Sequence, residues 1–236
     1  MLAMLPLALI PASYLVGSIP FGFLIARSQG IDIRTQGSGN IGATNVWRVM
    51  GSRWGALCFG LDLLKGFLPS AACAAVLHSG MGEGWTGTER GTLLALAVAI
   101  AAVLGHVFPV WLRFKGGKGI ATSFGALLGV YPVFTLAALI GLVAWLVSAR
   151  LTRMVGISSC IAAMLLAAWV VGTWAAPEGA QRAIGSVLGA LYRPASGVQA
   201  GFAVLLALLV ILKHRANLAR TWAGTEPRMG RGTGRK

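Results

Sequence analysis

The segment 37–45 (GSGNIGATN), followed closely by Arg48, has the composition of an anion-binding loop. Its glycines let the backbone approach an anion, and the interleaved Ser, Asn and Thr residues add hydrogen-bonding side chains. A guanidinium such as that of Arg48 is a permanently charged, forked donor that suits phosphate. A flexible loop that caps a helix is the alternative for the glycines alone. The residues of this segment expected to contact an anion or a reacting group are Ser38, Gly42, Thr44, Asn45 and Arg48.

A second segment, 105–119 (GHVFPVWLRFKGGKG), contains two lysines that frame a Gly-Gly pair. The pair stands directly before an apolar stretch, so positive charge and free N–H groups would lie at a helix N-terminus. The spacing is not that of a Walker A loop, and nucleotide binding is not implied. The alternative is that the lysines only anchor helix ends at anionic lipid headgroups. The expected binding residues are Lys115, Gly116, Gly117, Lys118 and Gly119.

A third segment, 213–226 (KHRANLARTWAGTE), follows the last apolar stretch. If the helix continues through it, His214 and Asn217 are neighbours at positions i and i+3. A histidine at the membrane surface can transfer a proton or form a hydrogen bond to a phosphate. The alternative for His214 is a purely interfacial role. We expect His214 to take part in the chemistry and Asn217 to bind substrate.

Acidic and cysteine residues give no sign of metal or disulfide chemistry. The acidic residues Asp32, Asp62, Glu83, Glu89, Glu178 and Glu226 form no metal-ligand cluster in sequence. Cys58, Cys73 and Cys160 lie in apolar stretches without CxxC spacing, as expected of buried packing residues. The polar segments contain neither a Gly-x-Ser-x-Gly elbow nor a cysteine nucleophile. We therefore expect no metal, no cofactor and no covalent enzyme intermediate.

The composition predicts an all-α integral membrane protein. Hydrophobic residues make up 56% of the 236 positions, charged residues 11%, and the mean hydropathy is +0.76. A soluble domain cannot bury so much apolar side chain. The chain has 20 Lys+Arg against 6 Asp+Glu, but its apolar stretches argue against nucleic acid as the partner. The first apolar stretch lacks a basic n-region and a cleavage site, and we expect it to be a retained span.

Stretches long enough to cross about 30 Å of hydrocarbon are 3–26, 54–77, 91–112, 154–176 and 197–213. The stretch 119–149 is too long for one span and short for two. Pro132 lies near its middle, and basic residues flank both of its ends. If both ends are cytoplasmic, the chain crosses twice between them and has seven spans. The alternative is five spans, with 119–149 forming a single long or re-entrant element.

Seven spans place the N-terminus outside and the C-terminus inside the cell. This arrangement puts most Lys and Arg residues, and all three polar segments, on the cytoplasmic side. We expect one transmembrane domain over 1–227 and a basic, disordered tail over 228–236. Asp62 and Lys65, three residues apart within a span, are expected to pair with each other inside the bundle.

The three segments, in this order, resemble the motifs of the bacterial acyl-phosphate:glycerol-3-phosphate acyltransferases, the PlsY family. The resemblance covers the whole chain in length and span pattern. Arg48 matches the arginine of the first motif, and the third motif includes Gly224 and Glu226. One departure is Gly156, where the family commonly has a serine; Ser158 and Ser159 follow it.

The resemblance implies an enzyme that transfers an acyl chain from acyl phosphate to the sn-1 hydroxyl of glycerol 3-phosphate. The products are lysophosphatidic acid and phosphate, in the first step of phospholipid synthesis. It further implies a multi-pass protein of the bacterial plasma (inner) membrane, with its active site facing the cytoplasm. A soluble acyl-phosphate synthase is an expected partner, besides the membrane lipid.

In this assignment, Ser38, Arg48, Lys118 and His214 are catalytic. A rival hypothesis is an organophosphate or anion transporter. Many transporters contain two repeated halves, and this sequence shows no such duplication. A second rival, a CDP-alcohol phosphatidyltransferase, would need an acid-rich metal motif that is absent from the sequence.

Overall fold

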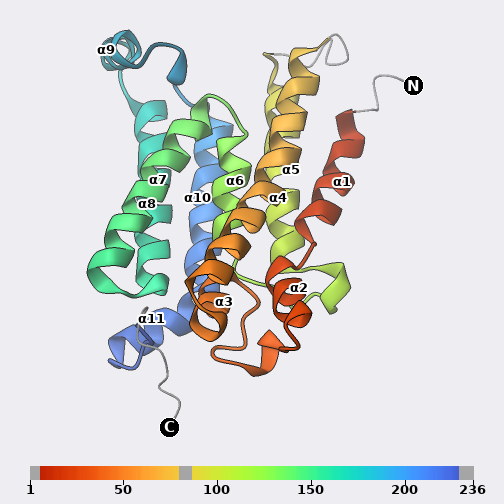
Figure 1. Ribbon diagram of the computed structural model, residues 1–236. Coiled ribbons are helices and arrows are strands. Elements are labelled where there is room, and N and C mark those ends of the chain that lie inside the picture. Colours follow the sequence, from red (N-terminus) through yellow and green to blue (C-terminus); the bar gives the residue numbers. More distant parts are fainter. Residues whose placement is uncertain (1–5, 80–86, 229–236) are drawn as a thin grey trace.

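The computed structural model describes residues 6–79 and 87–228, and every regular element in these ranges is a helix (Figure 1). The predicted all-α class is confirmed. The α-helices are α1 (Leu9–Gly17), α2 (Phe21–Ser28), α3 (Ala43–Met50), α4 (Ser52–His78), α5 (Glu89–Val107), α6 (Ile120–Leu128), α7 (Val133–Thr152), α8 (Val155–Ala175), α9 (Glu178–Leu188), α10 (Gly197–Lys213) and α11 (Arg215–Trp222). Short 3-10 turns at Ile33–Thr35, Val110–Leu112 and Gly189–Leu191 lie in the connections.

The first span is broken into two helices. The sequence predicts one apolar stretch over 3–26, of which residues 3–5 lie outside the described ranges. The structure has α1 and α2 in succession, and together they form one candidate span, Pro6–Ser28. The break falls just before Pro20, which has no N–H to donate and whose ring blocks a continuous helix.

Within the described ranges, five segments are long and apolar enough to cross a membrane: Pro6–Ser28, Ser52–His78, Glu89–Leu112, Val133–Thr152 and Val155–Ala175. A sixth passes only if α10 and α11, which meet at an angle of 56°, are counted as one broken span. The stretches predicted at 54–77, 91–112 and 154–176 correspond to three of these segments.

The predicted hairpin over 119–149 is present as α6 and α7, with the break just before Val133. However, α6 has only nine residues, which rise about 14 Å, half of the hydrocarbon thickness. Positions 121–127 are all buried, so α6 lies inside the bundle and not against lipid. Seven full-length spans are therefore not confirmed, because the first half of the predicted pair is a short interior helix.

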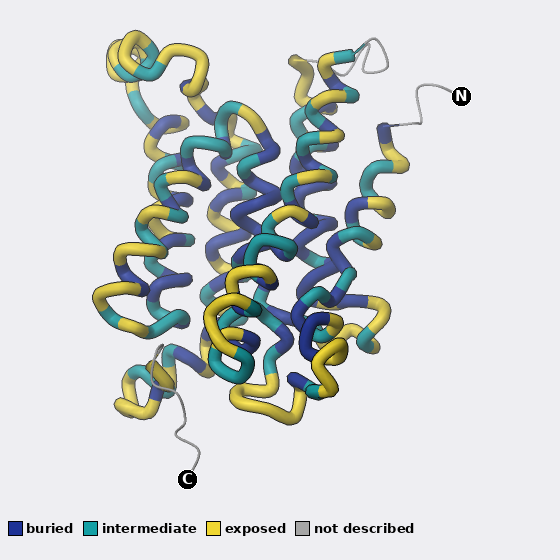
Figure 2. Tube along the Cα trace, viewed as in Figure 1, coloured by how far each residue is buried: buried dark blue, intermediate teal, exposed yellow. Residues whose placement is uncertain are grey.

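The helices run alternately between two ends of the bundle (Figure 1). One end holds the start of α1 and α9, and the other holds α2, α3 and α11. All three polar segments gather at this second end. Figure 2 shows the buried positions concentrated along the central helices, where Phe134, Val170 and Ala203 belong to the largest apolar core. The predicted burial of the three cysteines is confirmed.

Glycines let α4 and α6 approach each other at backbone distance. A Cβ on Gly125 would lie 1.9 Å from the Leu63 carbonyl oxygen, and a Cβ on Gly66 would lie 2.2 Å from the Thr122 carbonyl oxygen. Small residues at such crossings permit the close packing that drives helix association in membranes. This contact fixes α6, and with it the loop that precedes α6.

Replacing Gly125 with Ala is expected to destabilise the bundle by about 1–3 kcal/mol, the cost of overpacking a close contact. Gly60→Ala is the matched control, because Gly60 also lies in a helix but an added Cβ there would meet no atom within 4 Å. Thermal unfolding in detergent should show a lower Tm for Gly125→Ala and an unchanged or slightly raised Tm for Gly60→Ala. Equal Tm values would contradict the close contact.

Candidate active site

Asn45 organises the first segment from the first turn of α3. Its side chain is buried, and its Oδ1 accepts a hydrogen bond from the Ser38 N–H at 2.8 Å. Its Nδ2 donates to the Gln36 carbonyl at 2.9 Å and to the Ile33 carbonyl at 3.3 Å. A Cβ on Gly37 would lie 2.4 Å from Asn45 Oδ1, and Gly37 has φ +58°, so only glycine fits. The loop is therefore held against α3.

The other predicted residues of this segment surround Asn45. Gly42 precedes α3, and its N–H donates to Asn40 Oδ1 at 2.8 Å. Ser38 is exposed, while Thr44 and Arg48 are half-buried. Nη1 of Arg48 lies 3.5 Å from Asn45 Oδ1, the atom that also accepts from Ser38. The structure thus brings Ser38, Asn45 and Arg48 together.

The Gly-Gly pair of the second segment packs on His106. The Gly117 N–H donates to the His106 carbonyl at 3.1 Å, and a Cβ on Gly117 would lie 2.1 Å from His106 Nε2. A Cβ on Gly116 would lie 2.1 Å from the His106 carbonyl oxygen. Gly119 has φ +79° at the start of α6. These glycines were predicted to contact an anion. The structure shows another reason for glycine at each position: a side chain at Gly116 or Gly117 would collide with His106, and Gly119 has a positive φ.

Lys118 connects the second segment to the third. Its Nζ donates to Asn217 Oδ1, and Asn217 Nδ2 donates to Glu226 Oε1. Arg220 Nε donates to Glu226 Oε2 at 2.8 Å. Burial lowers the pKa of Lys118 to about 8; Glu226 opposes this shift, while Arg220 and Arg48 add to it. We call Lys118, Asn217, Glu226 and Arg220 the basic–acid network.

Lys115, in contrast, is exposed. The structure does not bring it into the basic–acid network, although the sequence predicts the two lysines as a pair. The electrostatic effect of Arg48 on Lys118 links the first segment to this network.

His214 lies at the break between α10 and α11 and is 1% exposed. Its Nδ1 donates to the Val210 carbonyl at 2.8 Å in the tautomer that this contact favours. Its Nε2 is buried without a hydrogen-bond partner. Because burial disfavours the charged ring, Nε2 is a free acceptor at the edge of the site. His214 and Asn217 are both buried at this end, as residues of one site should be.

Sequence reasoning assigned no role to Glu226 or Arg220. Glu226 is buried and accepts hydrogen bonds from both Asn217 and Arg220. The available signal was that Glu226 is the one acidic residue in the otherwise basic stretch from Lys213 to the C-terminus.

Gly156, the departure from the family pattern, lies directly against Asn217. A Cβ on Gly156 would lie 2.3 Å from Asn217 Cβ. Ser158 and Ser159 donate their hydroxyl groups to the Met154 and Val155 carbonyls of their own helix, at 2.9 and 2.8 Å. Asn217 therefore occupies the space beside Gly156, and neither neighbouring serine points its hydroxyl into that space.

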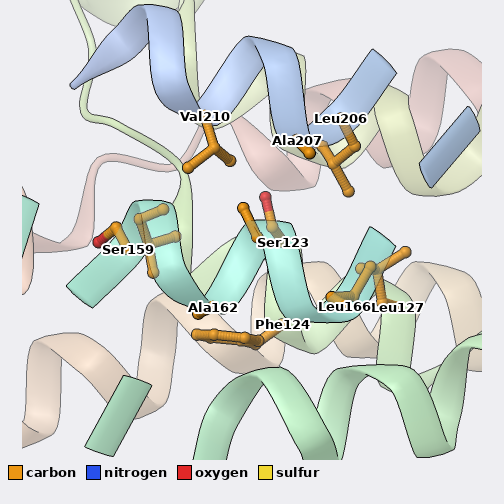
Figure 3. A pocket seen from close by; sticks show the side chains of 11 residues that line it. Ser123, Phe124, Leu127, Ser159, Ala162, Leu166, Leu206, Ala207 and Val210 are labelled. Carbon is orange, nitrogen blue, oxygen red and sulfur yellow. The ribbon is translucent and has the colours of Figure 1, made fainter. Parts of the chain in front are cut away.

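A narrow apolar cavity of about 30 Å³ lies between α6, α8 and α10 (Figure 3). It is lined by Ile120, Ser123, Phe124, Leu127, Ser159, Ala162, Ala163, Leu166, Leu206, Ala207 and Val210. The Ser123 hydroxyl points toward α10, and it has no hydrogen-bond partner. Ile120 follows Lys118 by two residues, and Val210 carries the carbonyl that His214 contacts. The cavity thus lies within the bundle, and two of its lining residues are close in sequence to residues of the polar site.

In the part of the chain that the structure describes, no group of three or more His, Cys, Asp or Glu residues is arranged to hold a metal ion. The predicted absence of a cofactor stays a prediction.

Comparisons with known proteins support the resemblance to glycerol-3-phosphate acyltransferases. A family model described as glycerol-3-phosphate acyltransferase matches residues 7–224. The glycerol-3-phosphate acyltransferase of Geotalea daltonii is 38% identical over 220 residues, which cover 93% of this chain and 95% of the relative. That of Sinorhizobium medicae is 40% identical over 225 residues, covering 95% and 92%.

Two solved structures share the fold. PlsY (YgiH), an integral membrane glycerol 3-phosphate acyltransferase in its glycerol 3-phosphate form, superposes with a TM-score of 0.72 at 34% identity. It covers 95% of this chain and 96% of its own. The lysophosphatidic acid form gives a TM-score of 0.70 at 33% identity, covering 95% of each chain. The chain therefore belongs to the glycerol-3-phosphate acyltransferase family, that of the integral membrane protein PlsY.

Proposed function

We propose that this protein transfers an acyl chain from an acyl phosphate to the sn-1 hydroxyl of glycerol 3-phosphate, releasing lysophosphatidic acid and phosphate. The observation that carries this proposal is the meeting of three polar segments at one end of the bundle, around the basic–acid network. The glycerol 3-phosphate and lysophosphatidic acid forms of the solved relatives support the acceptor and the product.

The charge of the site suits two phosphate groups. Arg220 and Arg48 both lie within electrostatic range of Lys118, and one carboxylate, that of Glu226, opposes these three positive charges. Arginine forks and a half-buried lysine are the donors that proteins use for phosphate. The surplus of positive charge would hold the donor phosphate and the acceptor phosphate close together.

The chemistry needs little beyond proximity and polarisation. An acyl phosphate is a mixed anhydride: the glycerol oxygen attacks the acyl carbon, the bond from that carbon to the phosphate oxygen breaks, and phosphate leaves with the electron pair. Holding the reactants together can supply about 7–11 kcal/mol, and each preorganised donor to the developing oxyanion about 3–4 kcal/mol. Positioned donors would therefore supply most of the catalysis.

The side chains suggest distinct roles. Ser38, whose N–H is fixed by Asn45, would donate its hydroxyl to the reacting carbonyl. His214 Nε2, buried and without a partner, would accept a hydrogen bond from the glycerol hydroxyl, and Asn217 would orient the acceptor. The hydroxyl proton would pass either to His214 Nε2 or to a phosphate oxygen of the substrate. Exposed Lys115 would attract the anions at the entrance.

The acyl chain would lie between spans, since the cavity between α6, α8 and α10, at about 30 Å³, has room for little more than a water molecule. A chain bound there would leave its phosphate at the polar end of the bundle.

The membrane arrangement follows from charge. We place the polar end at the cytoplasmic face of the bacterial inner membrane, with the N-terminus outside, because Lys and Arg concentrate there. In this arrangement the chain passes seven times between the two ends, with α6 as a half-length segment shielded by protein. A soluble acyl-phosphate synthase would deliver the donor to this face.

The donor is tested with purified protein in detergent, glycerol 3-phosphate, and in separate reactions palmitoyl phosphate, palmitoyl-CoA or acyl carrier protein thioester. We expect lysophosphatidic acid and stoichiometric phosphate from the acyl phosphate alone, without added metal. Product from a thioester alone would reject the donor assignment. Transport of phosphate esters into liposomes with no acyl transfer would reject the proposed acyltransferase function.

Ser38→Ala and Arg48→Ala should each lower kcat/KM by about 10²–10³-fold, because each removes a preorganised donor to developing or bound charge. Ser186→Ala and Arg182→Ala are matched controls on α9 at the opposite end of the bundle, and we expect normal rates from both. Unchanged rates in Ser38→Ala and Arg48→Ala together would remove these residues from the mechanism.

The rate should also depend on the charge of Lys118. With a pKa of about 8, the free enzyme carries this charge below pH 8 and loses it above. Phosphate monoesters are already dianionic there, since their second pKa is near 6. We therefore expect kcat/KM for glycerol 3-phosphate to fall about tenfold per pH unit above pH 8. Lys118→Arg should be less active but independent of pH in this range, and an identical profile would exclude Lys118 as the titrating group.

A further inference from the structure

A buried ion cluster lies within the bundle beneath the second polar segment. Lys65 Nζ and Asp62 Oδ1 of α4 are 2.8 Å apart, and their side chains are 2% and 3% exposed. The predicted pairing of these two residues is confirmed. His106 of α5, which sequence reasoning did not add to the pair, places its Nδ1 3.6 Å from the same Asp62 oxygen. Ionisable side chains at such depth are costly and generally serve a function.

Lys65 has a structural task of its own. Its Nζ donates to the Ile19 carbonyl at 2.7 Å, at the break between α1 and α2. The Phe21 N–H donates to the same carbonyl at 3.1 Å, so Lys65 supplies it with a second donor where the helix is interrupted. This contact accounts for Lys65 and for the carboxylate that neutralises it, but not for His106.

The other edge of the His106 ring meets the Gly-Gly pair. Because a Cβ on Gly117 would lie 2.1 Å from Nε2, the ring and this backbone are already in contact. The His106 carbonyl holds the Gly117 N–H, and the next residue is Lys118. The ring therefore lies between a fixed carboxylate and the backbone that carries the lysine of the site.

We infer that His106, packed between Asp62 and Gly117, is a positioning residue: it sets the backbone of 116–118 so that Lys118 Nζ reaches Asn217. A displaced ring would let this backbone move toward α4 and withdraw the lysine from the basic–acid network. The inference rests on the proposed role of Lys118 in binding glycerol 3-phosphate.

A double-mutant cycle tests the contact. Gly117→Ala should raise KM for glycerol 3-phosphate at least tenfold, because the added Cβ collides with the ring; its φ is not positive, so the backbone itself accepts alanine. His106→Ala should also raise KM, with a smaller change in kcat. The double variant should reverse most of the rise in KM caused by Gly117→Ala, since the new methyl group enters the vacated space.

Two further variants separate positioning from folding. His106→Asn keeps a polar atom toward Asp62 but withdraws from Gly117, so we expect a near-normal Tm with the raised KM. His106→Ala combined with Gly125→Ala is the matched control, because the Cβ of residue 125 meets α4 and not the ring. No rescue of Tm or KM is expected there.

A KM in His106→Asn equal to that of the unmodified protein, or a double variant no better than Gly117→Ala, would overturn the inference. KM for the acceptor can be measured with whichever donor sustains turnover, so a wrong donor assignment leaves this test intact. If Lys118→Ala left KM unchanged while the cycle showed rescue, the contact would stand and the proposed phosphate role of Lys118 would fail.

Discussion

The hydrogen bond between Lys118 and Asn217 is the contact on which the site depends, because it joins segments 99 residues apart in the sequence. Lys118 leaves the backbone just before α6, and Asn217 belongs to α11, beyond a bend of 56°. Glu226 then closes the network from the C-terminal side. A half-buried ammonium is stable only with such partners, so the loops and the bent helix hold one another in place.

Backbone contacts made possible by glycine determine the geometry around that bond. Gly125 seats α6 on α4, Gly117 lies on His106, and Gly156 leaves room for Asn217. Each of these positions tolerates no side chain without movement of a neighbour. The site is therefore fixed by close packing of main chain, and its few charged side chains extend from that rigid base.

Composition and motif order predicted the helical membrane class, the three segments at one end and most of the residues that meet there, because these depend on local pattern. The half-length α6 was not predicted, since hydropathy measures apolar length and not whether protein or lipid surrounds it. The contacts of Glu226, Arg220 and His106 were missed for a related reason. Their partners come from other helices or from beyond a bend, and no local spacing encodes such contacts.

The contact between Lys65 and the Ile19 carbonyl has a consequence for biogenesis. In hydrocarbon an ammonium group is unfavourable, and its cost falls when it donates to this carbonyl. The segment with the broken helix leaves the ribosome before α4. These two segments gain free energy by associating before either is surrounded by lipid, so the order of synthesis favours a first pair that forms during insertion and receives the remaining helices afterwards.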